Sequence, residues 1–359
     1  MISKSLKKIA SAAALTAGVA LSAGAQAEEV KVGFVYVGPT GDHGWSYQHD
    51  LGRQAIEKEL GLETSYVENV AEGPDAQRVI NKLASSGHNL IFTTSFGFMN
   101  PTLKAAKRNK NVMFEHATGY KQSKNVATYS SRFYEGRYVV GHIAGKMTKS
   151  NTIGYIASFP IPEVIRGINA TYLGAKKVNP DIKIKIVWVN SWFDPGKESD
   201  AAKTLIDQGA DVIMQHTDSP APVQVAEKRG VWSVGQASDM TSFGPKSHLT
   251  AIVDNWAPYY IARAKAAMDG SWKGGGDTWG GFSTGMVELA ELNSAIPADV
   301  QELANSVRAG ITDGSIHPFT GPLNDNAGNE IVAAGSNADD GMLARMNVYV
   351  EGIEAEVPQ

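Results

Sequence analysis

One short run of the sequence has the form of a catalytic centre. Gly281-Phe282-Ser283-Thr284-Gly285 fits the pattern G-x-S-x-G, in which the central serine of a hydrolase is the nucleophile. Such an enzyme needs a strand before the serine, a helix after it, and then an acid and a histidine. The neighbouring residues do not predict that order of elements, and His317 is the only histidine that follows. An exported α/β hydrolase is therefore the least favoured function.

Metal and cofactor chemistry has even less support. The eight histidines are scattered and form no H-E-x-x-H or similar ligand spacing. The chain has no cysteine, which excludes disulfides, thiolate nucleophiles and cysteine-ligated metals. Neither a P-loop nor a G-x-G-x-x-G run after the first predicted strand is present. We therefore expect no cofactor, no metal and no enzymatic activity, and favour a protein that binds its ligand.

Large aromatic residues that follow predicted strands are better candidates for a site. Open α/β sheets bind ligands beyond the carboxyl ends of their strands. Trp45 follows the first predicted strand, Trp192 follows a strand expected over residues 182–189, and Phe98 follows a third. Because the two tryptophans fall in different halves of the chain, they would form a slot for a planar ring if the halves faced each other. Alternatively, each ring covers the core of its own half.

Polar side chains near the same strand ends complete the candidate binding site. They are Asp42, Asn100, Asp218 and Asp239. A single aspartate in such a position is more often a helix cap or a turn residue than a ligand contact. Asn100 and Asp239, together with Arg166, could instead form the polar rim of a sugar-binding site. A sugar or another small polar ligand on the same fold is the alternative function.

The elements that would position these residues alternate along the chain. Strand-like runs over residues 31–37, 64–67 and 90–94 are separated by helical stretches, which predicts βαβ units and a mostly parallel sheet. The alternation starts again with a helix over 134–147 and a strand over 152–157. A chain of 359 residues is long enough for two cores. The sequence therefore predicts two similar α/β lobes, each a doubly wound parallel sheet.

The N-terminus predicts export from the cytoplasm. Three lysines within residues 4–8 precede an apolar stretch over residues 9–23, and Ala25-Gln26-Ala27 fits a signal-peptidase site. We expect cleavage after Ala27 and a soluble protein in the periplasm. The formal net charge is −4, and mixed charges without a basic patch argue against a nucleic-acid partner.

Several motifs, in matching order and spacing, resemble one family. They are Asp42-His43-Gly44-Trp45-Ser46, the run from Glu135-Gly136 to Gly141, Ser191-Trp192-Phe193-Asp194-Pro195, and Gln208 to Val212. The chain resembles the basic membrane protein family of ABC-transporter substrate-binding proteins over nearly all of its mature length. This resemblance implies capture of a purine nucleoside or base and its delivery to a membrane permease.

The resemblance also implies the type I periplasmic binding protein fold, with three crossovers that we place near residues 130, 254 and 285. The N-terminal lobe would comprise residues 28–130 and 254–285, and the C-terminal lobe residues 131–253 and 286–359. Trp45 and Trp192 match the two aromatics that sandwich the purine. Asn100 stands where the family has an acid at the purine edge. We expect a monomer.

Some positions depart from the pattern of nucleoside binders. Ala237 replaces the first acid of the ribose-contacting Gly-x-Asp-x-Asp run, and the ribose-binding lysine is absent around residues 253–255. The lipid-anchoring cysteine of the family is also missing. The sequence therefore predicts an unanchored protein that prefers a free nucleobase, such as adenine, over a nucleoside.

Overall fold

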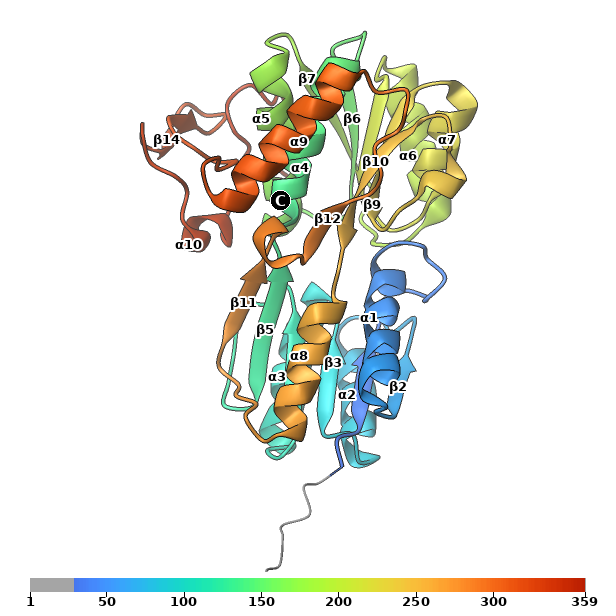
Figure 1. Ribbon diagram of the computed structural model, residues 1–359, viewed down its shortest axis with the longest axis vertical. Coiled ribbons are helices and arrows are strands. Elements are labelled where there is room, and N and C mark those ends of the chain that lie inside the picture. The colour runs from blue at the N-terminus through green and yellow to red at the C-terminus, as the bar shows by residue number, and fades with distance from the viewer. Residues whose placement is uncertain (1–28, 359) are drawn as a thin grey trace, which may run out of the picture.

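The computed structural model describes residues 29–358, so the predicted signal peptide, residues 1–27, lies outside the described residues. The chain forms two α/β lobes arranged end to end, each built on a six-stranded sheet (Figure 1). The first half of the chain builds most of the lower lobe in Figure 1 and the second half most of the upper one. The two-lobed α/β fold predicted from the sequence is confirmed.

The sheet of the N-terminal lobe is parallel throughout. Its strands, in spatial order, are β11 (Asp277–Gly280), β5 (Val126–Ser131), β4 (Met113–Ala117), β3 (Leu90–Thr93), β1 (Val32–Val35) and β2 (Thr64–Val67). β1 and β3 are completely buried, as expected for central strands with helices on both faces. The covering helices are α1 (Trp45–Leu60), α2 (Pro74–Ser85), α3 (Met99–Arg108) and α8 (Ala257–Met268).

The sheet of the C-terminal lobe repeats this architecture with one antiparallel edge strand. Its strands are β12 (Val287–Leu289), β10 (His248–Asp254), β9 (Trp232–Ala237), β8 (Val212–His216), β6 (Thr152–Ala157) and β7 (Lys183–Trp188), and β12 alone runs antiparallel to its neighbour. The helices of this lobe are α4 (Phe133–Met147), α5 (Pro162–Val178), α6 (Pro195–Asp207), α7 (Ala221–Arg229) and α9 (Ala298–Asp313).

Glycines let two helices of this lobe approach closely. A Cβ at Gly174 of α5 would lie 2.1 Å from the carbonyl oxygen of Tyr138 in α4, and one at Gly141 of α4 would lie 2.4 Å from the carbonyl oxygen of Thr171 in α5. Both distances are far below van der Waals contact, so only glycine allows this packing. The contact holds α4 against α5, and both helices contribute residues near the interlobe cavity.

The chain passes between the lobes three times. It passes from β5 into α4, from β10 into α8, and from β11 through a short 3₁₀ helix (Phe282–Thr284) into β12. These passages lie side by side at the junction of the lobes (Figure 1). Neither lobe is therefore formed by one continuous segment, and the predicted three-crossover topology is confirmed.

The C-terminal segment packs against the C-terminal lobe. It contains the hairpin of β13 (Leu323–Asn324) and β14 (Glu330–Val332) and the short helix α10 (Asp340–Leu343). Tyr349 is completely buried, and Nη1 of Arg166 in α5 donates a 2.6 Å hydrogen bond to the carbonyl oxygen of Leu343. The C-terminal segment is thus a packed part of this lobe. Within residues 29–358, no helix combines the length and hydrophobicity needed to cross a membrane.

Candidate functional site

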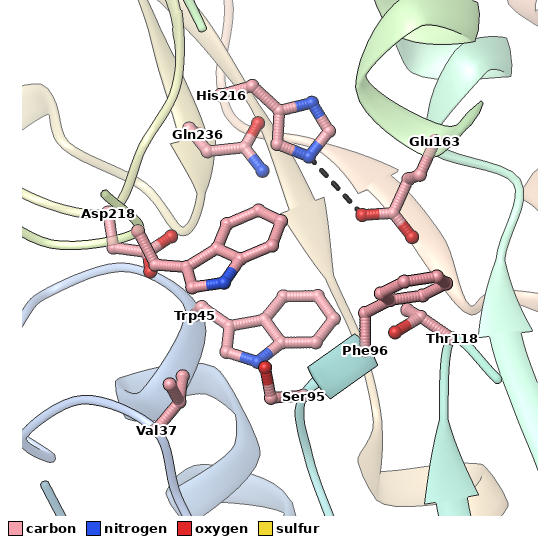
Figure 2. Close-up of a pocket in the computed structure, with 10 residues that line it drawn as sticks. Val37, Trp45, Ser95, Phe96, Thr118, Glu163, His216, Asp218 and Gln236 are labelled. Atoms are coloured by element: carbon pink, nitrogen blue, oxygen red, sulfur yellow. Dashed lines mark ion pairs between the residues drawn. The ribbon is translucent and has the colours of Figure 1, made fainter. Parts of the chain in front are cut away.

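A cavity of about 340 Å³ lies between the lobes, where the carboxyl ends of the two sheets face each other. Residues from both lobes line it: Val37, Trp45, Ser95, Phe96 and Thr118 from the N-terminal lobe, and Glu163, Trp192, His216, Asp218 and Gln236 from the C-terminal lobe (Figure 2).

Trp45 is the large aromatic side chain that the N-terminal lobe contributes. It is the first residue of α1, and its indole N–H donates a 2.6 Å hydrogen bond to the carbonyl oxygen of Thr94 at the end of β3. The rings of His49, Trp256 and Phe133 meet it edge to face, at centroid distances of 4.4, 5.5 and 5.9 Å. These contacts fix the ring before any ligand arrives, which lowers the entropy cost of stacking.

Trp192 is its counterpart from the C-terminal lobe. The residue lies in the loop after β7, its ring packs against Phe159 at 5.1 Å, and its carbonyl oxygen accepts a 2.9 Å hydrogen bond from the backbone N–H of Asp218. The indole nitrogen is buried and has no hydrogen-bond partner within residues 29–358. Among the described residues this N–H is therefore an unpaired donor in a residue of the cavity wall, which costs about 1–3 kcal/mol.

Glu163 and His216 form a polar pair at the edge of the cavity. Oε1 of Glu163, in the first turn of α5, lies 3.4 Å from Nε2 of His216 at the end of β8 (Figure 2). Burial lowers the pKa of His216 and outweighs the carboxylate of Glu163, which acts in the opposite direction. The imidazole of His216 is therefore neutral at pH 7.

Two aspartates at the junction are buried. Burial raises the pKa of Asp218 well above its ordinary value, and the nearby carboxylates of Asp42 and Glu198 raise it further. Burial likewise raises the pKa of Asp254, whose carboxyl oxygens have no hydrogen-bond partner among the described residues. Asp218 lines the cavity, so the closed site favours its protonated form, which can both donate and accept a hydrogen bond.

Direct contacts hold the two lobes together over the cavity. A Cβ at Gly44, just before α1, would lie 2.4 Å from the backbone carbonyl oxygen of Asp218 in the other lobe. Beside this contact, the hydroxyl of Ser238 donates a hydrogen bond to the carbonyl oxygen of His43, and the rings of His43 and Phe243 lie 4.9 Å apart. The lobes thus meet directly beside the cavity, and this close approach leaves no room for a side chain at position 44.

Several residues around the cavity have left-handed backbone conformations although they are not glycine. They are His43, Thr118, Asn190 and Ala237, with φ between 51° and 62°. This conformation is unusual, above all for the β-branched Thr118, and each instance costs about 1–3 kcal/mol. Such strain gathers at functional sites. Its position here, in loops at the strand ends, agrees with a ligand site in this cavity.

The structure brings together some of the residues predicted from the sequence and separates others. Trp45, Trp192 and Asp218 line one cavity. Phe98 is completely buried in the core of the N-terminal lobe, and Phe96, two residues earlier, lines the cavity instead. Asn100 is exposed in the first turn of α3.

The remaining two predicted residues act as caps in this structure. Asp42 is buried beneath the start of α1, where its carboxylate accepts hydrogen bonds of 2.8–3.0 Å from three backbone N–H groups, those of Gly44, Ser46 and Tyr47. Asp239 is exposed and accepts hydrogen bonds from the backbone and hydroxyl of Thr241. These contacts are those expected of N-terminal caps and turns.

Glu163, His216 and Gln236 line the cavity but were not among the predicted residues. His216 is the last residue of β8, and Gln236 is the last but one of β9. The rule that ligands bind at the carboxyl ends of strands, which led to Trp45 and Trp192, could therefore have found both. Glu163 follows β6 by six residues and enters the site from the first turn of α5. A polar residue in the first turn of a helix has no comparable sequence pattern that marks it as part of a binding site.

The serine of the G-x-S-x-G run does not lie in a nucleophile elbow. Ser283 is exposed in a 3₁₀ helix that leads into β12, so a strand follows it where a hydrolase needs a helix. Across residues 29–358, no group of three or more histidine, aspartate or glutamate side chains could hold a metal ion.

A comparison with known families agrees with this geometry. The family of PnrA-like ABC transporter substrate-binding proteins matches residues 29–317. The chain belongs to this family. The resemblance inferred from the sequence motifs is therefore confirmed, and the protein is a substrate-binding component of ABC transport.

Two curated relatives cover most of the chain. A purine-binding protein of Brucella abortus (strain 2308) is 54% identical over 96% of this chain and 99% of its own length. A putative ABC transporter glucose-binding protein of Haloferax volcanii is 38% identical over 93% of this chain and 82% of its own. Both names describe substrate-binding proteins.

Solved structures show the same fold at lower identity. A solute-binding protein of an ABC transporter system from Aeropyrum pernix K1 has a TM-score of 0.70 and 21% identity, covering 82% of this chain and 94% of its own. A solute-binding protein from Conexibacter woesei has a TM-score of 0.65 and 20% identity, covering 80% and 98%. These likenesses support the two-lobed fold.

The buried carboxyl of Asp218 makes a prediction about pH. Because its pKa is higher in the folded than in the unfolded protein, its stabilising contribution is complete below the unfolded value of about 4 and is lost as the pH rises through the folded value. Relative to Asp218→Asn, the wild-type free energy of unfolding should therefore fall as the pH rises above about 4, by at most about 1.4 kcal/mol per pH unit.

Chemical denaturation across this pH range measures the difference. The buried histidines, whose lowered pKa values act in the opposite direction, are common to both proteins and cancel. Asp239→Asn, which removes an exposed carboxylate, is the matched control for the loss of one acidic group. Parallel curves for Asp218→Asn and the wild type would contradict this assignment.

Proposed function

We propose that this protein captures a purine, with the free nucleobase preferred over the nucleoside, and delivers it to the permease of an ABC importer. The observation that carries the proposal is the pair Trp45 and Trp192, one from each lobe, in a single cavity of about 340 Å³. Flat aromatic rings on a small cavity favour a planar ligand. The 54% identical relative named as purine-binding supports the same ligand class.

The polar groups of the cavity agree with a heterocyclic base. The indole N–H of Trp192 offers a donor, and the carboxyls of Glu163 and Asp218 offer acceptors, with Asp218 also able to donate. A purine carries ring nitrogens that accept and N–H groups that donate around its whole edge. A purine can therefore pair with both kinds of group while its faces remain available for stacking.

The preference for a base over a nucleoside depends on whether the ribose hydroxyls would find hydrogen-bond partners. Ala237 is completely buried and offers no acceptor, and Asp239 is exposed and engaged with Thr241. Glu163 already faces His216. Ribose hydroxyls buried without partners would cost about 1–3 kcal/mol each. Adenine should therefore be held more tightly than adenosine.

A sugar is the second candidate ligand, because the 38% identical relative is named as glucose-binding. A neighbouring cavity of about 590 Å³ shares Phe96, Thr118 and Glu163 with the first and adds Arg166 and Trp279, among others. An aromatic ring with charged groups around it is a suitable surface for a polyhydroxyl ligand. Titration with glucose beside adenine distinguishes the two candidates.

We also propose that the mature chain begins at Glu28, acts as a monomer in the periplasm and carries no lipid anchor. The signal-peptide pattern over residues 4–27 and the absence of cysteine support this proposal. The family's role in ABC transport supports a permease as its membrane partner.

Removing either tryptophan should weaken purine binding. Stacking of a base on an aromatic ring contributes about 1–3 kcal/mol, so Trp45→Ala or Trp192→Ala should raise the Kd for adenine by roughly 5- to 150-fold. Isothermal titration calorimetry of ligand-stripped protein measures this change. Trp272→Ala, in the N-terminal lobe but not part of the cavity lining, is the control. Unchanged affinity in both cavity variants would show that the rings only cover their own lobes.

The same titrations test the preference for a base. Adenine should bind at least about tenfold more tightly than adenosine, equivalent to 1.4 kcal/mol. Hypoxanthine, guanine and their nucleosides extend the comparison. Equal affinity for adenosine would refute the argument from Ala237, and failure of every purine together with binding of glucose would establish the second candidate.

Closure of the lobes should depend on Gly44. In Gly44→Ala the new methyl group would meet the carbonyl oxygen of Asp218, and because this is backbone it cannot move aside. Overpacking of this kind costs about 1–3 kcal/mol, so the affinity for adenine should fall by roughly 5- to 150-fold. Gly41→Ala, in the same loop but with nothing within 4 Å of the added Cβ, should keep wild-type affinity. If the two variants bind equally, the Gly44 contact does not limit closure.

A further inference from the structure

Gln236 places a side-chain amide at the edge of the cavity. It lies in β9, one residue before the strand ends, and is 3% exposed. An amide can present either its carbonyl oxygen or its NH₂ group to a ligand, and the two ends have opposite hydrogen-bonding character. What the ligand meets at this point therefore depends on which neighbour holds the other end.

Arg137 holds the oxygen end. It lies in the first half of α4, is completely buried, and its Nη2 donates a hydrogen bond to Oε1 of Gln236. A guanidinium group can only donate, so the amide oxygen must face Arg137. The NH₂ group then faces away from Arg137, and Figure 2 shows this nitrogen directed toward the centre of the cavity.

Several groups surround the buried guanidinium of Arg137. Burial lowers its pKa, and the nearby side chains of Tyr155, Asp254 and Glu163 act in the opposite direction. The guanidinium also lies over the ring of Tyr155, at 5.4 Å. Since Nε and Nη1 have no hydrogen-bond partner among residues 29–358, the bond to Gln236 is the one directed contact of this cation in the described chain.

We propose that Gln236 is a specificity-determining residue that donates a hydrogen bond to a ring nitrogen of the purine, and that Arg137 is the positioning residue that prevents its amide from turning over. The inference rests on the proposed function and names the residue that recognises one edge of the purine ring. The site thereby selects against heterocycles that present a donor or a C–H group to this amide, although such rings would stack equally well on Trp45 and Trp192.

Deaza analogues of adenine test the first half of the proposal. The 1-, 3- and 7-deaza forms each replace one ring acceptor by C–H and leave the shape of the ring unchanged. One of them should bind the wild type roughly 5- to 100-fold more weakly than adenine, because the Gln236 NH₂ group is left unpaired. In Gln236→Met, which keeps the length of the side chain without the donor, that analogue and adenine should bind within about twofold of each other.

Two further variants test the role of Arg137. In Gln236→Glu the carboxylate pairs with Arg137 and presents only acceptors, so the preference should reverse and the sensitive deaza analogue should bind more tightly than adenine. In Arg137→Met the amide of Gln236 is free to turn, so the discrimination against that analogue should shrink at least fivefold. If Arg137→Met does not fold by circular dichroism, the reversal in Gln236→Glu decides.

The outcomes separate the two levels of the argument. If wild type binds no purine, the proposed function fails and this inference with it. A second outcome is that the wild type binds adenine while the affinity of each deaza analogue relative to adenine is the same in Gln236→Met and Gln236→Glu as in the wild type. In that case this inference is overturned and the proposed function stands. A ratio that collapses in Gln236→Met, with reversal in Gln236→Glu, supports both roles.

Discussion

The carboxyl ends of two parallel sheets face each other across one cavity, and the position of each lining residue depends on this arrangement. Trp45 enters from the start of α1, while Trp192 enters from the loop after β7 in the other lobe. Neither lobe alone encloses a ligand. The backbone contact between Gly44 and Asp218 fixes how closely the lobes approach, and so determines the space left between the two tryptophans.

Closure also removes charged groups from water. Asp218, Asp254 and Glu163 are carboxyls at the junction, and Arg137 is the buried cation near two of them. Burying charges is unfavourable unless they are paired or neutralised. A ligand that pairs with the free donors and acceptors of the cavity would offset part of this cost and so stabilise the arrangement in which the lobes meet.

The sequence predicted the two lobes, and it placed the two tryptophans at strand ends that the structure brings to one cavity, because both features leave strong local patterns; the role of the tryptophans in binding stays a prediction. Alternating strands and helices specify parallel sheets, and a large aromatic residue just after a strand marks the ligand-binding edge. The prediction for Phe98 depended on a finer detail: a 3₁₀ helix over Phe96–Phe98 turns Phe98 into the core and leaves Phe96 at the cavity. Gln236 and Arg137 come together from positions 99 residues apart in sequence, which no local pattern reports.

A purine that binds between the two lobes should close them around itself. Small-angle X-ray scattering of ligand-stripped protein, with and without saturating adenine, tests it most directly, with glucose at the same concentration as the control. Binding between the lobes predicts that adenine lowers the radius of gyration toward the value calculated for this closed structure, and that glucose does not. An unchanged radius of gyration at saturating adenine, or a decrease with glucose alone, would contradict it.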